Sequence, residues 1–329
     1  MRFRFPTISL VVFLILSPSL LSAQENNFVE AWFLYEQGKA KLEDPGGPEL
    51  GEALLFFQEA IDKRGGTFPE AEMAIGDIYF REGAFALAKR QYNKAYELRT
   101  GMDIAEEKYT VLYRLANLHE IQELYADMEI DLRQVLEDQP YFVGDQFQQF
   151  QDAFLSTYYE KGVGHLFKLY RMDGVAFAVP AHAKLGWFYY RTGRPSAILH
   201  CLFALDIMIT EAVKELRRVD PGFVFTTVQA FLDAGLEREN IKQYLVAGEF
   251  FKTLYYLATS TYAASLPSLA ESVWQILATY PLEAVGASAT TYAELSRRQL
   301  ESSWLDPYIN PSARKIEFTR QQSTGQASP

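Results

Sequence analysis

IGDIYFREGAFALAKRQYNKA, residues 75–95, is the stretch that decides the fold class of this chain. Its apolar residues recur at intervals of three and four, which is the spacing of the buried face of a helix. Gly83 separates two such runs, at a place where a helix end favours a residue that tolerates left-handed backbone. The small residues Gly76 and Ala88 stand where two antiparallel helices would approach closely. The stretch therefore predicts a helical hairpin.

The same arrangement recurs elsewhere in the chain. We identify five candidate units, whose first helices carry Gly38, Gly76, Ala116, Gly186 and Ala258 at the equivalent small site. The first unit has three additional residues between its helices, in the turn sequence Asp44–Pro48. The fourth unit departs from the pattern, because Ile198 occupies the site where its second helix needs a small residue.

Residues 28–140, and more loosely residues 180–282, resemble the tetratricopeptide repeat family, whose unit is a helix-turn-helix. The resemblance implies an all-α fold, namely a right-handed superhelix of antiparallel helix pairs with a concave inner face that binds a ligand. It implies a binding role and no particular activity, since functionally unrelated proteins share the repeat.

Two stretches interrupt the regular units. Residues 145–180 predict a helix over Gln146–Tyr159 and a shorter one over His165–Met172, and residues 221–247 predict helices over Phe223–Leu232 and Glu239–Val246. These helices are either degenerate repeats or additions that pack on the superhelix. We therefore expect N-terminal repeats over residues 24–140, degenerate repeats over 141–310 and a polar, disordered tail over 311–329.

Residues 1–23 read as a signal peptide. Arg2 and Arg4 precede the apolar run Ile8–Leu16, and the segment ends in Leu21-Ser22-Ala23. We expect cleavage after Ala23 and an exported, periplasmic bacterial protein, with an uncleaved membrane anchor as the alternative.

The charge of the chain excludes some classes of partner. Its net charge is −11, and removal of a signal peptide with two arginines would make it −13. Nucleic acids and anionic membrane surfaces bind basic patches, so we expect neither as a partner.

The sequence offers few groups for catalysis. The histidines are His119, His165, His182 and His200, and none stands at a metal-ligand spacing from another His, Cys or acid. Cys201, the single cysteine, lies in an apolar run that predicts a buried thiol. We predict no enzyme, no metal and no cofactor, although a hydrolytic pair of carboxylates assembled from distant helices remains an alternative.

The predicted concave face follows from the repeat register. Its fifteen positions are Trp32, Tyr35, Lys39, Met73, Asp77, Phe80, Tyr113, Asn117, Glu120, Ala183, Trp187, Tyr190, Tyr255, Thr259 and Tyr262. Nine of the fifteen are aromatic or methionine, and contiguous exposed apolar surface commonly marks a contact site. We take all of them except Lys39, Glu120, Ala183 and Thr259 as candidate binding residues.

Two interpretations of this face compete. In one, the interrupting helices cover it and its aromatic residues are core. In the other, it is open and binds a partner. The leading functional hypothesis is a non-catalytic scaffold that binds a protein or peptide segment of the cell envelope. The alternatives are a transporter-associated protein that binds an apolar or amphipathic small molecule, and an enzyme acting on envelope polymers.

Overall fold

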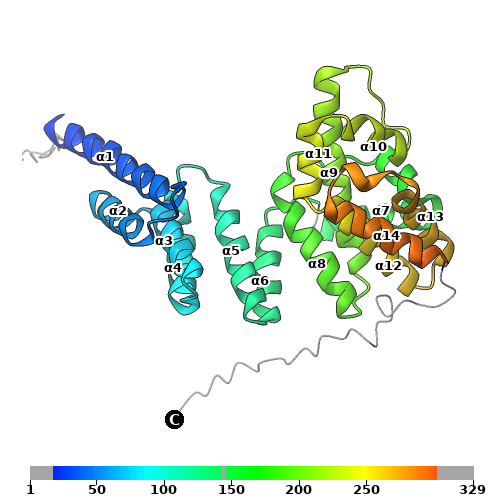
Figure 1. Cartoon of the computed structure of the whole chain (residues 1–329), viewed down its shortest axis with the longest axis horizontal. Coiled ribbons are helices and arrows are strands. Elements are labelled where there is room, and N and C mark those ends of the chain that lie inside the picture. The colour runs from blue at the N-terminus through cyan, green and yellow to red at the C-terminus, as the bar shows by residue number, and fades with distance from the viewer. Residues whose placement is uncertain (1–17, 142–144, 302–329) are drawn as a thin grey trace, which may run out of the picture. The chain divides into compact units, whose positions relative to one another are not determined.

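The computed structural model describes residues 18–141 and 145–301, and every regular element in that part of the chain is a helix (Figure 1). The all-α prediction is therefore confirmed for the described residues. The predicted tail at 311–329, and the predicted signal peptide as far as residue 17, lie outside them. None of the described helices combines the length and the apolar character that crossing a membrane requires. The helices form two compact units, one ending at Val111 and one beginning at Leu112.

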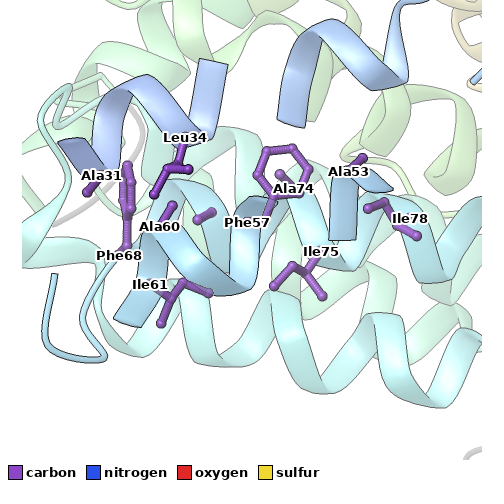
Figure 2. Packing of buried hydrophobic residues seen from close by; sticks show 11 residues of the cluster. Ala31, Leu34, Ala53, Phe57, Ala60, Ile61, Phe68, Ala74, Ile75 and Ile78 are labelled. Carbon is purple, nitrogen blue, oxygen red and sulfur yellow. The ribbon is translucent and has the colours of Figure 1, made fainter. Parts of the chain in front are cut away.

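Unit 1 consists of consecutive antiparallel helices. These are α1 (Pro18–Leu42), α2 (Leu50–Lys63), α3 (Pro69–Arg81) and α4 (Phe85–Glu97), followed by the 3₁₀ turn η1 (Arg99–Gly101). Apolar side chains from α1, α2 and α3 meet in one buried cluster that includes Leu34, Phe57 and Ile75 (Figure 2). The three- and four-residue spacing of these side chains along each helix produces this shared core.

Glycine allows the paired helices to approach closely. A Cβ atom built on Gly76 would lie 2.5 Å from Tyr92 Cε1, and one built on Gly38 would lie 2.6 Å from Phe57 Cε1. Such separations are too short for real side-chain atoms, so these positions in α3 and α1 require glycine unless the ring moves. The predicted close approach at Gly76 is confirmed.

Four helical hairpins turn in the same way. The residue two positions after the first helix has a positive φ in each: 74° at Gly83, 59° at Glu123, 69° at Gly193 and 65° at Ser265. The next amide then donates to a carbonyl five residues earlier: Ala84 N to Tyr79 O at 2.8 Å, Leu124 N to His119 O at 2.7 Å, Arg194 N to Tyr189 O at 2.8 Å and Leu266 N to Thr261 O at 3.2 Å. This is the Schellman helix end, and it confirms the left-handed conformation predicted at Gly83.

Unit 2 contains the remaining helices. These are α5 (Glu107–Ile121, which begins just before the unit boundary), α6 (Tyr125–Leu136), α7 (Asp145–Leu169), η2 (Ala176–Ala178), α8 (Val179–Arg191), α9 (Ala197–Val219), α10 (Val228–Leu236), α11 (Glu239–Ala247), α12 (Phe250–Ala263), α13 (Pro267–Thr279), η3 (Leu282–Ala284) and α14 (Ala287–Glu301). Helix α9 is buried along most of its length, as its nearly continuous apolar sequence requires. Helix α12 packs against α8, α9, α13 and α14, and so occupies the centre of this unit.

The interrupting segments are helical, as predicted, with shifted ends. Helix α7 covers most of the two helices predicted over residues 146–172, and its course is broken at Gly162, where φ is 76° and ψ is 175°. Helix α10 begins at Val228, five residues after the predicted start at Phe223. It begins there because the Thr227 side chain accepts a hydrogen bond from Ala230 N at 3.1 Å and caps the helix.

The third hairpin, α5 and α6, has polar contacts with the helices that follow it in unit 2. The hydroxyl of Tyr113 in α5 donates to Phe177 O at 2.5 Å, just before α8. Glu120 in the same helix pairs with Lys184 in α8. These polar contacts join the third hairpin to the later helices. The apolar periodicity of the sequence does not predict them.

Candidate functional site

The predicted binding residues of unit 1 are engaged in its own packing. Trp32 lies edge-on to Phe68 with ring centroids 5.1 Å apart, and Tyr35 lies 5.5 Å from Phe57. Met73 is buried. Trp32 and Tyr35 pack against the core formed by α1, α2 and α3.

Two more predicted residues tie α3 to its partner helix. Asp77 accepts a hydrogen bond from the Tyr92 hydroxyl at 2.8 Å. Phe80 packs on Phe85 with ring centroids 5.7 Å apart. Both contacts have a structural role that the register alone did not indicate.

Three predicted residues of unit 2 lie on α5 and α12. Tyr113 is bonded through its hydroxyl to Phe177 O, Asn117 is exposed on α5, and Tyr262 packs on Trp274 with ring centroids 5.5 Å apart. Tyr113 and Tyr262 therefore take part in the packing of unit 2.

The other three predicted residues, Trp187, Tyr190 and Tyr255, come together on α8 and α12. Tyr190 lies 5.6 Å from Tyr256, and Tyr255 lies 5.5 Å from Tyr292, measured between ring centroids. Tyr190 and Tyr255 are buried, whereas Tyr256 and Tyr292 are half-buried. We call the four tyrosines the tyrosine cluster. It joins α8, α12 and α14.

Trp187 extends this cluster along α8 and carries two cations. The Arg191 guanidinium carbon lies 5.0 Å from the centroid of the Trp187 ring, and Lys252 Nζ from α12 lies 5.7 Å from it. Both distances are within the range of a cation–π interaction. Trp187 is half-buried, so it is not closed off from solvent.

Arg191 has an unmet hydrogen-bonding requirement. Its Nε atom is buried and has no hydrogen-bond acceptor among the described residues. Lys252, in contrast, pairs with Glu249 at 2.7 Å. A planar guanidinium stacked on an indole can bind a carboxylate through paired hydrogen bonds.

Burial also affects the protonation of Tyr292 in the tyrosine cluster. It raises the pKa of Tyr292, and the neighbouring Tyr256 and Glu249 raise it further. Tyr292 therefore remains a neutral hydroxyl at physiological pH. Tyr255 accepts a hydrogen bond from Gln299 Nε2 at 3.1 Å. The cluster thus presents aromatic rings with polar tips, and the positive charge beside it comes from Arg191 and Lys252.

Sequence reasoning missed Tyr256, Tyr292, Arg191 and Lys252. Tyr292 lies on α14, after the last predicted unit. Arg191 lies four residues after Trp187 on α8, and Lys252 lies three residues before Tyr255 on α12. Each cation is therefore one helical turn from a residue of the predicted face and lies on the same side of its helix. A search one turn along each predicted position would have found the two cations.

A buried histidine pair was also missed. His182 Nδ1 lies 2.9 Å from His200 Nδ1, and His182 Nε2 lies 2.6 Å from Gln139 Oε1. Burial lowers the pKa of both histidines, so both are neutral and form part of the core. Similarly, His119 Nδ1 lies 2.6 Å from Asp131 Oδ2. Among the described residues no group of three His, Cys, Asp or Glu side chains has a metal-binding arrangement.

Comparison with known proteins gives distant relatives. The chain is 26% identical over 239 residues to an uncharacterized protein of Treponema pallidum (strain Nichols), a match that covers 70% of this chain and 63% of that protein. It is 24% identical over 272 residues to an uncharacterized protein of Borreliella burgdorferi (strain ATCC 35210 / DSM 4680 / CIP 102532 / B31), covering 76% of this chain and 83% of the relative. The chain thus spans just under two thirds of the length of the first of these relatives. No protein-family model matches the chain.

Proposed function

We propose that this chain is a helical-repeat protein of the tetratricopeptide type, a right-handed superhelix of helix pairs whose role is to bind another protein. The identical Schellman ends of four hairpins support this fold. The glycine contacts at Gly38 and Gly76 support it too, because the repeat requires close helix pairs. A repeat fold of this kind serves binding more often than catalysis.

The observation that carries the proposed function is the position of Trp187 between two cations. Tryptophan, tyrosine and arginine are the residues that contribute most binding energy at protein interfaces. Here the half-buried indole and the stacked guanidinium of Arg191 lie on α8 beside the tyrosine cluster, of which Tyr256 and Tyr292 are half-buried. We infer that this surface binds a protein segment that presents an apolar side chain to Trp187 and a carboxylate to Arg191.

The proposed location is the cell envelope, as an exported periplasmic protein. This part of the proposal rests on the signal-like sequence of residues 1–23. N-terminal sequencing of protein isolated from its native cell tests it: a mature chain that begins at Gln24 supports export, and one that retains Met1 in the cytoplasmic fraction opposes it.

Site-specific crosslinking tests the binding surface. A photoreactive amino acid is placed at Trp187 and, as the matched control, at Gln275, which is exposed on α13 of the same unit. Both proteins are irradiated in the envelope fraction of the native cell. We expect a discrete adduct from position 187 and none of that mass from position 275.

The second arm of the experiment asks whether the adduct depends on the cations. Arg191→Ala in the crosslinking protein should reduce the yield severalfold, because the carboxylate loses its partner, while circular dichroism remains unchanged. The proposed binding surface would be contradicted by equal adduct yields from positions 187 and 275. It would also be contradicted by a yield from position 187 that Arg191→Ala does not change.

The alternative function is to bind an apolar or amphipathic small molecule. The aromatic content of the predicted face motivated it, but Met73, Tyr190 and Tyr255 are buried and offer no wall to such a ligand. A described cavity of about 290 Å³ between α9 and α11 is lined by charged groups such as Glu211 and Lys214. Native mass spectrometry of the purified chain would favour this alternative if it detected a co-purifying lipid.

A further inference from the structure

A second cavity in unit 2 has a different character from the aromatic surface. It has a volume of about 450 Å³ and lies where α7 passes the start of α10 and the side of α13. Its lining includes Lys161, His165 and Lys168 from α7, Thr226 and Gln229 from the α10 region, and Ser272 from α13. None of the described residues that line it is Asp or Glu.

Basic residues from both sides of the break in α7 line the same cavity. His165 and Lys168 are three residues apart in the segment after Gly162, so they share a helix face. Lys161 precedes the break. Because Gly162 adopts φ 76° and ψ 175°, the chain changes direction there, and Lys161 lines the cavity together with the two later residues.

The two lysines of this cavity lack the partners that other lysines have. Many other lysines of the described chain lie within 4.0 Å of a carboxylate, among them Lys39, Lys41, Lys63, Lys94, Lys184, Lys214, Lys242 and Lys252. In the same described part of the chain, Lys161 and Lys168 have no carboxylate within that distance.

This lack of partners is informative in an acidic chain. The sequence contains 42 acidic and 31 basic residues, so a lysine meets a carboxylate easily. Two unneutralised lysines at one cavity without an acid in its lining make a local positive potential, and a concave surface concentrates such a potential. The neighbouring hydroxyl of Thr226 and amide of Gln229 add hydrogen-bond donors that need no counter-charge.

We propose that the cavity between α7 and α10 binds a small organic anion with at least two negative charges, held through its phosphate or carboxylate groups by Lys161 and Lys168. Lysine binds such oxyanions as a point charge. A volume of about 450 Å³ is within the range of small-molecule sites. This site is independent of the Trp187 surface and goes beyond the binding of a protein partner.

Calorimetric titration and thermal unfolding test the proposal on the full chain. The probes are inorganic phosphate and citrate, with sodium chloride at matched ionic strength as the blank and glycerol as the uncharged comparison. The variants are Lys161→Gln/Lys168→Gln and, as a control with the same change of charge in the same unit, Lys214→Gln/Lys242→Gln.

We expect at least one of the two anions to raise the Tm of the wild type by about 3 °C or more at a concentration tenfold above its Kd. The Lys161→Gln/Lys168→Gln variant should bind at least about tenfold more weakly, since it loses two charge-assisted contacts. The control variant should bind like the wild type. A response to phosphate alone identifies a phosphate site, and a response to citrate alone a carboxylate site.

Two results would overturn the proposal. One is a wild type that responds to neither anion beyond the salt blank. The other is an equal loss of affinity in both double variants, which would mean that the overall charge of the chain, and not this cavity, governs the response. Both lysines are exposed, so loss of folding in the variants is not expected, and circular dichroism checks it.

Discussion

Gly76 lies directly against the ring of Tyr92, and no side-chain atom fits between them. A Cβ on Gly76 would lie 2.5 Å from Tyr92 Cε1 and 2.6 Å from Cδ1. The ring is buried, and its hydroxyl donates to Asp77 Oδ1 at 2.8 Å, so it cannot move away without loss of that hydrogen bond. The closest approach of α3 and α4 therefore depends on this pair.

Gly76→Ala should destabilise unit 1 by about 1–3 kcal/mol, the range of overpacking in a close-packed core, and Gly76→Trp should cost more. The control is Gly51→Ala, because a Cβ at Gly51 in α2 meets no atom within 4 Å. That change should be neutral or stabilising, since alanine is the better helix former. Urea unfolding of the two variants measures the difference, and equal midpoints would mean that α3 and α4 are not in this register.

Glu123→Gly should stabilise the chain by about 1 kcal/mol. Glu123 has φ 59° at the helix end where the equivalent residues of two other hairpins are Gly83 and Gly193. A non-glycine residue in left-handed backbone carries about 1–2 kcal/mol of strain, which glycine relieves. Glu82→Gly is the control: its φ is −77°, so glycine there adds only flexibility and should destabilise by about 0.5–1 kcal/mol. Thermal unfolding would contradict the prediction if both variants lost stability.

Acid should destabilise the fold through the His182–His200 pair. Burial lowers the pKa of His182, with a contribution from His200, and burial with the charge of Arg133 lowers that of His200 to about 3. As the pH falls below the ordinary histidine pKa of about 6.5, the unfolded chain binds two protons that the folded chain does not. Stability is therefore lost as the pH falls from about 6.5 towards 4.

Asp206 opposes this trend. Burial raises its pKa to about 7, although the Met172 amide and Arg171 lower it in part. The folded chain then binds a proton at Asp206 that the unfolded chain lacks above its ordinary carboxyl pKa of about 3.9. The net difference of these three groups is one proton, or about 1.4 kcal/mol lost per pH unit between about pH 6 and 4.

Asp206→Asn should remove the proton uptake by the folded chain at this position. The loss of folding stability between about pH 6 and 4 should then steepen to about 2.7 kcal/mol per pH unit. Denaturant unfolding at a series of pH values, with wild type and variant compared, isolates the contribution from that of other carboxyl groups. Identical pH slopes for the two proteins would contradict the assignment of Asp206.

Cys201 should be inert to thiol reagents in the folded chain. It is fully buried, and burial raises the pKa of its thiol, so neither access nor thiolate is available. Because it is the single cysteine, a chromogenic disulfide reagent should react with one equivalent in denaturant and with none under native conditions. Rapid reaction of the native protein would mean that the α8–α9 hairpin opens readily.

The helical hairpins were predictable because local spacing encodes them. Each hairpin depends on features within fewer than 20 residues of one another: the apolar interval, the small site at Gly76 and the turn at Gly83. The structure has these features at the positions that the repeat register predicts. The fourth unit shows the limit of this logic. A Cβ atom built on its glycine, Gly186, would lie 2.6 Å from Cys201 Sγ and 3.5 Å from the carbonyl oxygen of Ala197, so the small site is shifted by one residue from the predicted Ile198.

The candidate site was predictable only in part. Register places Trp187, Tyr190 and Tyr255 on first helices, but it cannot reveal which neighbouring helix covers each ring. Tyr255 is buried because α14 supplies Tyr292 beside it, and this contact joins residues 37 positions apart.

By itself the sequence determined the all-helical class, the positions of the hairpins and their close contacts, because helix periodicity and turn chemistry are local. The tertiary structure alone decided that the third hairpin belongs to the second unit, that His182 meets His200, and that Lys161 and Lys168 line one cavity without acidic neighbours. Those features arise from the packing of segments distant in the chain, where burial and the geometry of polar contacts, not periodicity, determine which side chains meet.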